Sequence, residues 1–388
     1  MNILIAGFPY IRKEYRDTFK EYPKDDRIFF LLPKNWPIKK GAVIFEAPNE
    51  PNTISTHAFF YHSHYPLIGG LLKGCMPMFP IILFKNRKNT DLVYSCSEPT
   101  LLTTLYYGVW TTLFGKKHIM FSWENIPYEN KFHGLSGLVH SIILHLNLLF
   151  CDGIICGNQK GADMYKKLTT KPIAVVPMSG VDDQFFRRVH GSKIFRGQDW
   201  TNKVVFTFAG AIGYRKGIHL IIKVFSGVIK KIPNAHLVIA GSGEYESEID
   251  NLIAQNQLGL AVTRISWLDR TNLRTLLNTS DIFLYPSLPY RGWEEQFGYS
   301  MAEASLMELP IIATRSGSIE DVVVHEKTGL LIKTNDNMQL QDAMIRLASN
   351  EILRKKFGEA GRQYIVNNFS HRIIVEKFHS FFNQVMYS

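Results

Sequence analysis

Short, continuous apolar runs alternate with helical patterns along almost the whole chain, and this alternation restricts the fold more than any other feature. Such runs are typical of parallel strands that are buried on both faces. They lie at 2–6, 27–32, 91–95, 118–122, 153–156, 173–177, 204–209, 236–240, 262–266, 281–285, 311–314 and 329–332. Helical patterns separate them, for example at 217–230 and 338–348. The alternation predicts an α/β protein with two doubly wound, Rossmann-like domains.

The length of 388 residues also fits two domains better than one core. A polar segment at 187–203 has turn residues and no sustained period, which indicates a linker. We therefore expect an N-terminal Rossmann-like domain at 1–188, a linker at 189–202, a C-terminal domain at 203–369, and a C-terminal helix at 370–388 that packs back towards the first domain. Ligands bind beyond the carboxyl ends of parallel strands, so two such domains facing each other predict a central cleft.

The basic charge is concentrated in the first half of the chain. Residues 1–190 hold 22 Lys and Arg against 15 Asp and Glu, a balance of +7, whereas residues 191–388 hold 22 against 19, a balance of +3. A basic half is typical of proteins that bind an anionic partner, such as a membrane surface, a phosphorylated acceptor or a nucleic acid. The alternative is that the basic residues only keep the protein in solution.

The cysteines and the first residues bear on the compartment. Cys75, Cys96, Cys151 and Cys156 form no Cys-x-x-Cys pair and no zinc pattern with histidine. They are therefore expected to be free, buried thiols of a reduced compartment. The first seven residues resemble a strand and lack the basic start of a signal peptide. We expect a cytoplasmic protein, with peripheral attachment to the inner face of the membrane as a further hypothesis.

Two apolar stretches have the length of a membrane span. Lys73 and three prolines interrupt the stretch 65–84, which argues against a span. The stretch 132–151 has no formal charge, but on a helix its polar and apolar residues fall on opposite halves. The polar half holds Ser136, His140, Ser141, His145 and Asn147, and the apolar half holds Leu135, Leu138, Val139, Ile142, Leu146 and Leu149. This pattern predicts an amphipathic helix, and it favours a core helix over a membrane-surface helix.

The strongest functional pattern follows the predicted strand at 281–285. A loop carries Glu294 and Glu295, and a helix is expected to begin near Gly298. The first N–H groups of a helix have no partner within it, so they can bind a diphosphate or sugar hydroxyls. Glu295 can accept hydrogen bonds from sugar hydroxyls, and Glu303 can accept them from both hydroxyls of a ribose. The alternative is a solvated acidic loop followed by a surface helix.

A second pattern follows the strand at 204–209. Gly210 and Gly213 let the backbone approach a phosphate, and Lys216 supplies a positive charge. The next predicted strand ends in Gly241-Ser-Gly243-Glu244, where part of a nucleotide pocket could lie. Each pattern taken alone is also compatible with an ordinary turn between a strand and a helix.

Taken in order, these residues resemble the donor-binding signature of the retaining GT-B glycosyltransferases of family four. Their pattern is Glu, seven residues, Glu, and Glu295 with Glu303 matches it. The resemblance continues through 310–314, Gly317, Glu320 and 328–331, and a weaker one covers 204–243 and 151–186. Together these segments cover about half of the chain.

The resemblance implies a retaining, metal-independent transfer of a sugar from a nucleotide-sugar donor to an acceptor hydroxyl. It implies that Lys216 neutralises the donor diphosphate. Relatives have an arginine soon after the first glycine, where this chain has Ala211, and Arg215 is the expected substitute. The expected donor-binding set is Arg215, Gly213, Gly241, Gly243, Phe297, Gly298, Tyr299 and Glu303, and the expected catalytic set is Glu295, Lys216 and Glu124.

The resemblance also implies that the domain at 1–188 binds the acceptor and the domain at 203–369 binds the nucleotide-sugar donor. The acceptor side is defined by fewer residues. Many relatives carry a histidine after the strand read here at 118–122, whereas this chain has Trp123-Glu124-Asn125. Glu124 is the candidate acceptor contact, and Gly7 is placed on the acceptor side. The expected acceptor is a lipid-linked glycan or a polysaccharide precursor. The stretch 65–84, flanked by Lys85, Arg87 and Lys88, could dock on an anionic membrane or pack inside the first domain.

No metal or separate cofactor is expected. His62 and His64 lack a third ligand, and no Asp-x-Asp motif is convincing. An epimerase of nucleotide-sugars on a similar double fold is the nearest alternative. A dinucleotide oxidoreductase is disfavoured because neither glycine-rich turn, at Gly7 or at Gly210, reads Gly-x-Gly-x-x-Gly. A nucleic-acid-binding protein is suggested by charge alone, and no recognised binding motif supports it.

Overall fold

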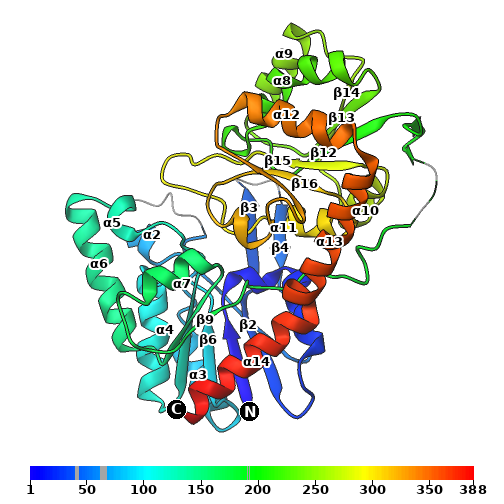
Figure 1. Ribbon diagram of the computed structural model, residues 1–388. Coiled ribbons are helices and arrows are strands. Elements are labelled where there is room, and N and C mark those ends of the chain that lie inside the picture. Colours follow the sequence, from blue (N-terminus) through cyan, green and yellow to red (C-terminus); the bar gives the residue numbers. More distant parts are fainter. Residues whose placement is uncertain (40–42, 62–67, 190, 192) are drawn as a thin grey trace. The chain divides into compact units, whose positions relative to one another are not determined.

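The computed structural model describes residues 1–39, 43–61, 68–189, 191 and 193–388 (Figure 1). The chain divides into two compact units. The first contains residues 1–180 and 371–388, and the second contains residues 181–370. Each unit is built around its own parallel sheet.

The sheet of the first unit is parallel throughout, in the order β5-β2-β1-β6-β7-β8-β9. Its strands are β1 (Asn2–Ala6), β2 (Arg27–Pro33), β5 (Thr53–Thr56), β6 (Leu92–Ser95), β7 (Lys117–Ser122), β8 (Gly153–Cys156) and β9 (Ile173–Val175). A small antiparallel ribbon is formed by β3 (Asn35–Lys39) and β4 (Val43–Glu46). The strand order reverses between β1 and β6, which is where doubly wound sheets bind ligands.

Helices surround this sheet (Figure 1). They are η1 (Phe8–Ile11), α1 (Lys13–Thr18), η2 (Phe19–Glu21), α2 (Ile68–Leu71), α3 (Phe79–Asn86), η3 (Arg87–Asn89), α4 (Leu102–Leu113), α5 (Tyr128–Lys131), α6 (Gly134–Leu149), α7 (Gln159–Tyr165) and α14 (His371–Tyr387). Within the described residues, no helix has both the length and the apolar character needed to cross a membrane.

The C-terminal helix α14 belongs to the first unit. The ring of Phe378 lies 5.2 Å from that of Phe19 and 5.6 Å from that of Tyr94. A Cβ atom on Gly153 would lie 2.8 Å from the side chain of Val385, so β8 and α14 pack without room for a larger residue. The end of the chain therefore completes the core of the unit in which the chain begins.

The second unit has a parallel sheet in the order β14-β13-β12-β15-β16-β17. Its strands are β12 (Val204–Ala209), β13 (Ala235–Ala240), β14 (Val262–Ile265), β15 (Ile282–Tyr285), β16 (Ile311–Thr314) and β17 (Gly329–Ile332). The order reverses between β12 and β15, so the carboxyl ends of these two strands mark the expected ligand position.

Three helices of the second unit begin at a side chain that caps them. Asp269, Asp336 and Asn350 each accept a hydrogen bond from a backbone N–H three residues later, which caps α10, α12 and α13. The helices are η4 (Tyr214–Lys216), α8 (Ile218–Lys231), α9 (Glu246–Gln255), α10 (Arg270–Asn278), α11 (Tyr299–Leu306), η5 (Ile319–Asp321), α12 (Asn337–Ala348) and α13 (Glu351–Phe369).

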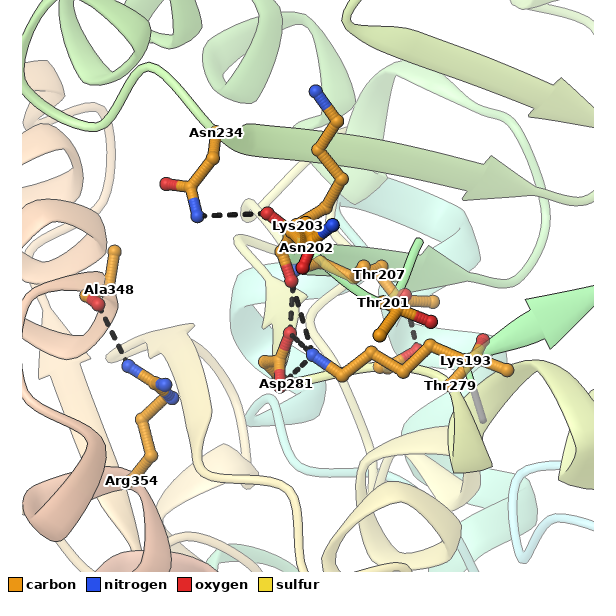
Figure 2. Close-up of polar contacts among 12 residues, drawn as sticks. Lys193, Thr201, Asn202, Lys203, Thr207, Asn234, Thr279, Asp281, Ala348 and Arg354 are labelled. Atoms are coloured by element: carbon orange, nitrogen blue, oxygen red, sulfur yellow. Dashed lines mark hydrogen bonds and ion pairs between the residues drawn. The ribbon is translucent and has the colours of Figure 1, made fainter. Parts of the chain in front are cut away.

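The segment 189–202, expected as a linker, lies within the second unit, and the first unit's N-terminal part ends at residue 180 rather than 188. A two-residue turn joins β10 (Ile194–Phe195) to β11 (Gln198–Asp199), and Phe195 stacks on the buried Trp200. Lys193 Nζ lies 2.7 Å from Asp281 Oδ2 (Figure 2). The same oxygen also accepts a hydrogen bond from the N–H of Val205. These contacts fasten the segment to β12 and to the residue before β15.

The helix predicted within 132–151 is present as α6, but its orientation differs from the core-helix interpretation. Leu135, Leu138, Ile142, Leu146 and Leu149 are exposed. The buried side is partly polar, because Asn147 is buried and donates hydrogen bonds to the carbonyl oxygens of Pro99 and Leu101. A buried amide must find such partners, and here the loop before α4 supplies them. Most of the apolar half of α6 is therefore exposed, together with Ser136, Ser141 and His145 of the polar half.

The stretch 65–84 is described from residue 68 onwards and divides between core and surface. Met76, Phe79 and Leu83 are in the core of the first unit, whereas Met78, Ile81 and Phe84 are exposed. Among the cysteines, Cys96, Cys151 and Cys156 are buried and Cys75 is half-buried, and all are free thiols. The histidine pair at 62 and 64 lies outside the described residues.

Candidate functional site

Two loops meet at the point where the strand order of the second unit reverses. The loop after β12 carries Gly213, Arg215 and Lys216, and the loop after β15 leads to Glu295 and Gly298. The two loops touch closely, since a Cβ atom on Gly217 would lie 1.9 Å from the carbonyl oxygen of Pro286. Gly217 also has a φ of 68°, which a glycine adopts at little cost. The sequence therefore folds both loops against each other.

Lys216 and Glu295 form a buried ion pair at this junction. Lys216 Nζ lies 2.5 Å from Glu295 Oε2 and also donates to the hydroxyl of Tyr285. Burial lowers the pKa of Lys216 below its usual value, and the neighbouring Glu295 carboxylate opposes that shift. The additional hydrogen bonds hold the two charged groups of this buried ion pair in place. Such an arrangement is expected at a site that must present a charge at a fixed position.

Further groups fix the Glu295 carboxylate and backbone. Tyr285 donates to Glu295 Oε2 at 2.8 Å, and Ser287 donates to the same oxygen at 3.2 Å. The Glu295 carbonyl accepts the N–H of Ser318 at 2.8 Å. A Cβ atom on Gly317, whose φ is 57°, would lie 2.1 Å from that carbonyl. Residues that follow β12, β15 and β16 thus converge on Glu295.

Arg215 lies beside this pair and is held by an aromatic ring. Its guanidinium carbon lies 3.7 Å from the centre of the Trp293 ring, a strong cation–π geometry. Within the described residues, Arg215 Nη1 is buried and has no hydrogen-bond partner. An unpaired guanidinium nitrogen in a buried position is costly. An anionic ligand beside Lys216 would satisfy it.

The glycines of the expected donor set have a packing reason that is independent of any ligand. A Cβ atom on Gly241 would lie 1.8 Å from the carbonyl oxygen of Gly210, and one on Gly243 would lie 2.2 Å from that of Ile212. A Cβ atom on Gly213 would lie 2.8 Å from a carboxylate oxygen of Glu244. The loops after β12 and β13 therefore pack backbone against backbone.

The helix expected near Gly298 begins at Tyr299, and Gly298 precedes it with a φ of 83°. Phe297 is buried, and its ring lies 4.8 Å from that of Tyr299 and 5.1 Å from that of Phe369. These aromatic contacts anchor the start of α11. Glu303 lies on α11, in its second turn, and is half-buried.

The expected acceptor-side residues belong to the first unit. Gly7 directly follows β1, and a Cβ atom there would lie 2.8 Å from that of Cys96, so the glycine permits close packing of the segments that follow β1 and β6. Glu124 follows β7 and is buried. Its carboxylate accepts hydrogen bonds from the N–H groups of Asn125 and Ile126 and pairs with Lys131. These contacts give Glu124 a structural role beside any contact with an acceptor.

Glu98 was missed by the sequence analysis, although it follows the buried strand β6. Its carboxylate accepts a hydrogen bond from Ser122 Oγ at 2.8 Å and from the N–H of Trp123 at 2.9 Å. Burial, and then the charge of Glu124, raise its pKa to about 7. A carboxyl group three residues after a buried parallel strand is the signal that could have identified it. Two carboxyl groups therefore follow neighbouring strands of the first unit.

The charge of Lys73 interacts with that of Glu98. Its ammonium group is 5.2 Å from the centre of the Phe8 ring, which stacks on Trp36 at 4.0 Å. Burial lowers the pKa of Lys73, and the charge of Glu98 opposes that shift. Within the described part of the chain, no cluster of three or more His, Cys, Asp and Glu side chains could hold a metal ion.

Comparison with known proteins finds a family model that matches part of the chain. Residues 192–364 match the family model of the glycosyl transferases group 1. A capsular polysaccharide biosynthesis glycosyltransferase of Staphylococcus aureus, CapM, is 30% identical over 183 residues, which is 46% of each chain. A GDP-mannose-dependent mannosyltransferase of Corynebacterium glutamicum, which acts on a monoacylated phosphatidylinositol monomannoside, is 32% identical over 171 residues, 42% of each chain. The chain thus matches less than half the length of these two relatives.

Solved structures extend the likeness to the whole fold. HepE of Anabaena in complex with UDP and glucose has a TM-score of 0.73 at 15% identity, covering 99% of this chain and all of that one. Sucrose-phosphate synthase of Thermosynechococcus elongatus has a TM-score of 0.72 at 16% identity, covering 100% and 99%. Residues 192–364 are thus similar to the glycosyl transferases group 1, and the two Rossmann-like domains of the chain have the GT-B fold of these solved structures.

Proposed function

We propose that the chain is a retaining, metal-independent glycosyltransferase that transfers a sugar from a nucleotide-sugar to an acceptor hydroxyl. The observation that carries this proposal is the convergence of Lys216, Glu295 and Arg215 at the switch point of the second unit. It combines a fixed ion pair with a buried, unpartnered guanidinium nitrogen. Structures of the similar HepE contain UDP and UDP-glucose, which supports a donor of this class.

In the proposed reaction, the bond between the anomeric carbon and the diphosphate breaks while an acceptor oxygen forms a new bond to that carbon. The departing phosphate oxygen accepts the proton of the acceptor hydroxyl, so charge and atoms balance. Lys216 and Arg215 stabilise the negative charge that develops on the diphosphate, and the N-terminus of α11 adds its N–H groups. Glu295 orients the transferred sugar through its hydroxyls, and Glu303 binds the ribose.

Glu295 and Glu303 are assigned binding roles rather than the roles of a glycosidase pair. A retaining glycosidase places a carboxylate nucleophile and a carboxylic acid on opposite sides of the bond that breaks. Here Glu295 already pairs with Lys216, Tyr285 and Ser287, all within one buried cluster. Such a carboxylate is suited to holding a substrate hydroxyl in a fixed position.

The acceptor that we propose is a lipid-linked glycan or polysaccharide precursor at an anionic membrane surface. On α3, the exposed Ile81 and Phe84 lie beside Lys85, and Arg87 stacks on Phe84 at 4.1 Å. Lys88 is also exposed. Each cation close to an anionic bilayer contributes roughly 1 kcal/mol at low salt. The names of the two curated relatives, one in capsule synthesis and one acting on a glycolipid, support an acceptor of this kind.

The proposal is tested by a screen of nucleotide-sugars in thermal unfolding, followed by analysis of the product. A ligand that binds only the folded protein stabilises it by about 2.7 kcal/mol at 100 times its dissociation constant. We expect stabilisation by a nucleotide-sugar in the wild-type protein and a weaker effect in Lys216→Ala and Glu303→Ala. If no nucleotide-sugar or nucleoside diphosphate stabilises the wild-type protein, the donor assignment is wrong.

A further inference from the structure

The loop after β15 contains a tight hairpin. The N–H of Tyr290 donates to the carbonyl oxygen of Trp293 at 2.9 Å, and the N–H of Trp293 donates to that of Tyr290 at 3.0 Å. Between them, Arg291 and Gly292 have φ values of 48° and 70°. Successive residues with positive φ form the turn that best fits the twist of a short β-hairpin. The backbone of this turn therefore fixes the positions from which the side chains of Tyr290 and Trp293 leave the loop.

The two ends of this hairpin contact consecutive residues of η4, in the loop after β12. The ring of Tyr290 lies 5.1 Å from the ring of Tyr214. The ring of Trp293 lies 3.7 Å from the guanidinium carbon of Arg215. Tyr214 is also stacked on His219 of α8, with ring centres 4.6 Å apart. The hairpin therefore holds η4 at neighbouring positions, and its contact with Trp293 gives the Arg215 side chain a defined direction.

Stacking on an indole ring holds a guanidinium group without using its hydrogen-bond donors. The N–H groups of arginine lie in the plane of the guanidinium, whereas the attraction to an aromatic ring acts through its face. An ion pair with a carboxylate would occupy these donors and compensate the charge. Among the described residues, Arg215 Nη1 has no hydrogen-bond partner, so a donor remains for a ligand. The Trp293 ring also lies close to Lys216, whose Nζ is 5.5 Å from the ring centre. Trp293 therefore borders both cations of the candidate donor site.

We propose that Trp293 is a positioning residue for nucleotide binding, which holds the Arg215 guanidinium so that its N–H groups meet the diphosphate beside Lys216. The inference rests on the proposed function, since it requires a nucleoside diphosphate group at this site. It extends that function by giving a role to a side chain that acts through another. Two other roles are outcomes of the test: the ring could contact the nucleotide itself, or it could only cover the ion pair of Lys216 and Glu295. In both of these cases, the effect of Trp293 on nucleotide binding would not depend on Arg215.

A double-mutant cycle separates these roles, because it measures whether the effect of one side chain depends on another. Calorimetry with UDP and with GDP gives the dissociation constants of the wild type, Trp293→Leu, Arg215→Met and the double variant. We expect Trp293→Leu to raise the dissociation constant about tenfold, since the ligand must then order a mobile arginine. In the Arg215→Met background, the same change should alter the constant by less than about twofold. An equal loss in both backgrounds, or no loss in the presence of Arg215, would overturn the proposal.

Rescue and control variants complete the test. Trp293 is half-buried, so its variants should fold, and melting temperatures check this. Trp293→Phe keeps an aromatic face for Arg215 and should bind the nucleotide within about threefold of the wild type. The matched control is Phe185→Leu, because the Phe185 ring lies 4.3 Å from the guanidinium carbon of Arg270 and 4.6 Å from that of Arg274. This control should bind the nucleotide like the wild type.

The wild-type protein distinguishes the two levels of the proposal. If it binds neither UDP nor GDP, the donor assignment is wrong, and the role of Trp293 is overturned with it. If it binds one of them and Trp293→Leu binds that nucleotide equally well, only the role of Trp293 is wrong.

Discussion

Lys216 Nζ and Glu295 Oε2 lie 2.5 Å apart, although the two residues follow different strands of the second unit. Lys216 follows β12, which pairs with β13, and Glu295 follows β15, which pairs with β16. The pair therefore forms at the point where the strand order of the sheet reverses, between β12 and β15. Lys216 therefore has two roles to distinguish, as the charge partner of the buried Glu295 and as a contact for any bound diphosphate. Removing its side chain affects both.

We predict that Lys216→Met lowers the free energy of unfolding by about 3 kcal/mol or more, since it leaves a buried carboxylate without its charge partner. The double variant Lys216→Met/Glu295→Gln should recover most of that loss, because the uncompensated charge is gone. Nucleotide-sugar stabilisation should remain weak in both. Chemical unfolding with and without nucleoside diphosphate measures the two effects. Recovery of nucleotide binding together with stability would show that Lys216 acts only on Glu295.

Glu295 and Glu303 should differ in the kinetic constant that they change. Glu303→Ala should raise the dissociation constant of the nucleotide about tenfold or more, because the ribose hydroxyls lose the carboxylate that accepts their hydrogen bonds. Glu295→Ala should mainly lower kcat, since the transferred sugar is no longer oriented. Calorimetry with the nucleoside diphosphate and steady-state kinetics separate the two. Glu294→Ala, in the same loop, is the control and should change neither constant.

Much of the fold follows from the strand pattern. The predicted apolar runs coincide with β1, β2, β6 to β9 and β12 to β17, because strands buried on both faces are nearly all apolar. The short strand β5 and the ribbon of β3 and β4 were missed. The hairpin of β10 and β11 is short and polar, so the sequence predicts a linker there and not two strands. Its turn residues Arg196 and Gly197 have positive φ values of 49° and 79°. Because arginine is not a residue typical of turns with a positive φ, the sequence does not indicate this turn.

The order of the motifs was enough to propose a donor site, but the geometry of these residues could not be predicted. The sequence contains Lys216 and Glu295, whereas their ion pair, and the roles of Tyr285 and Ser287 in it, depend on three strands coming together. The orientation of α6 could not be predicted either. Its polar half looks like a solvent face, and only the position of the carbonyl oxygens before α4 shows why Asn147 is buried.

Glu98 should make stability depend on pH. Its pKa is raised to about 7 by burial and by Glu124, so the folded protein holds this proton more tightly than the unfolded chain does. Stability from this group is then present below its ordinary pKa of 4.5 and is lost as the pH rises towards about 7. Glu98→Gln should remove the dependence and stabilise the protein by about 1–3 kcal/mol at about pH 8.

Unfolding at about pH 5 and about pH 8 checks this expectation. The exposed Glu129→Gln is the matched control, and it should shift the two values equally. An unchanged difference between the two pH values in Glu98→Gln would show that other groups titrate in this range. Those groups would include His118, whose pKa burial lowers to about 4.

Activity should persist after exhaustive chelation. The charge on the leaving diphosphate is assigned to Lys216, Arg215 and the start of α11, so no divalent ion is needed in the proposed mechanism. Product formation is measured after dialysis against a chelator, and then after addition of Mg²⁺ or Mn²⁺. A complete loss that a divalent ion restores would contradict the mechanism, because these side chains would then be insufficient.

Replacing Glu308 with glycine should stabilise the second unit. Glu308 follows the end of α11 with a φ of 58°, a conformation that disfavours a side chain by about 1–2 kcal/mol. Glycine adopts it freely but loses more backbone entropy on folding, roughly 0.5–1 kcal/mol, so the net gain should be about 0.5–1 kcal/mol. Thermal unfolding of Glu308→Gly measures it, and Gln257→Gly, whose φ is 55° at the end of α9, should behave alike. Lys355→Gly, inside the exposed side of α13, should instead destabilise by about 1 kcal/mol. If Glu308→Gly lowers the melting temperature, as Lys355→Gly is expected to do, then the side chain of Glu308 makes contacts that outweigh the strain of its backbone.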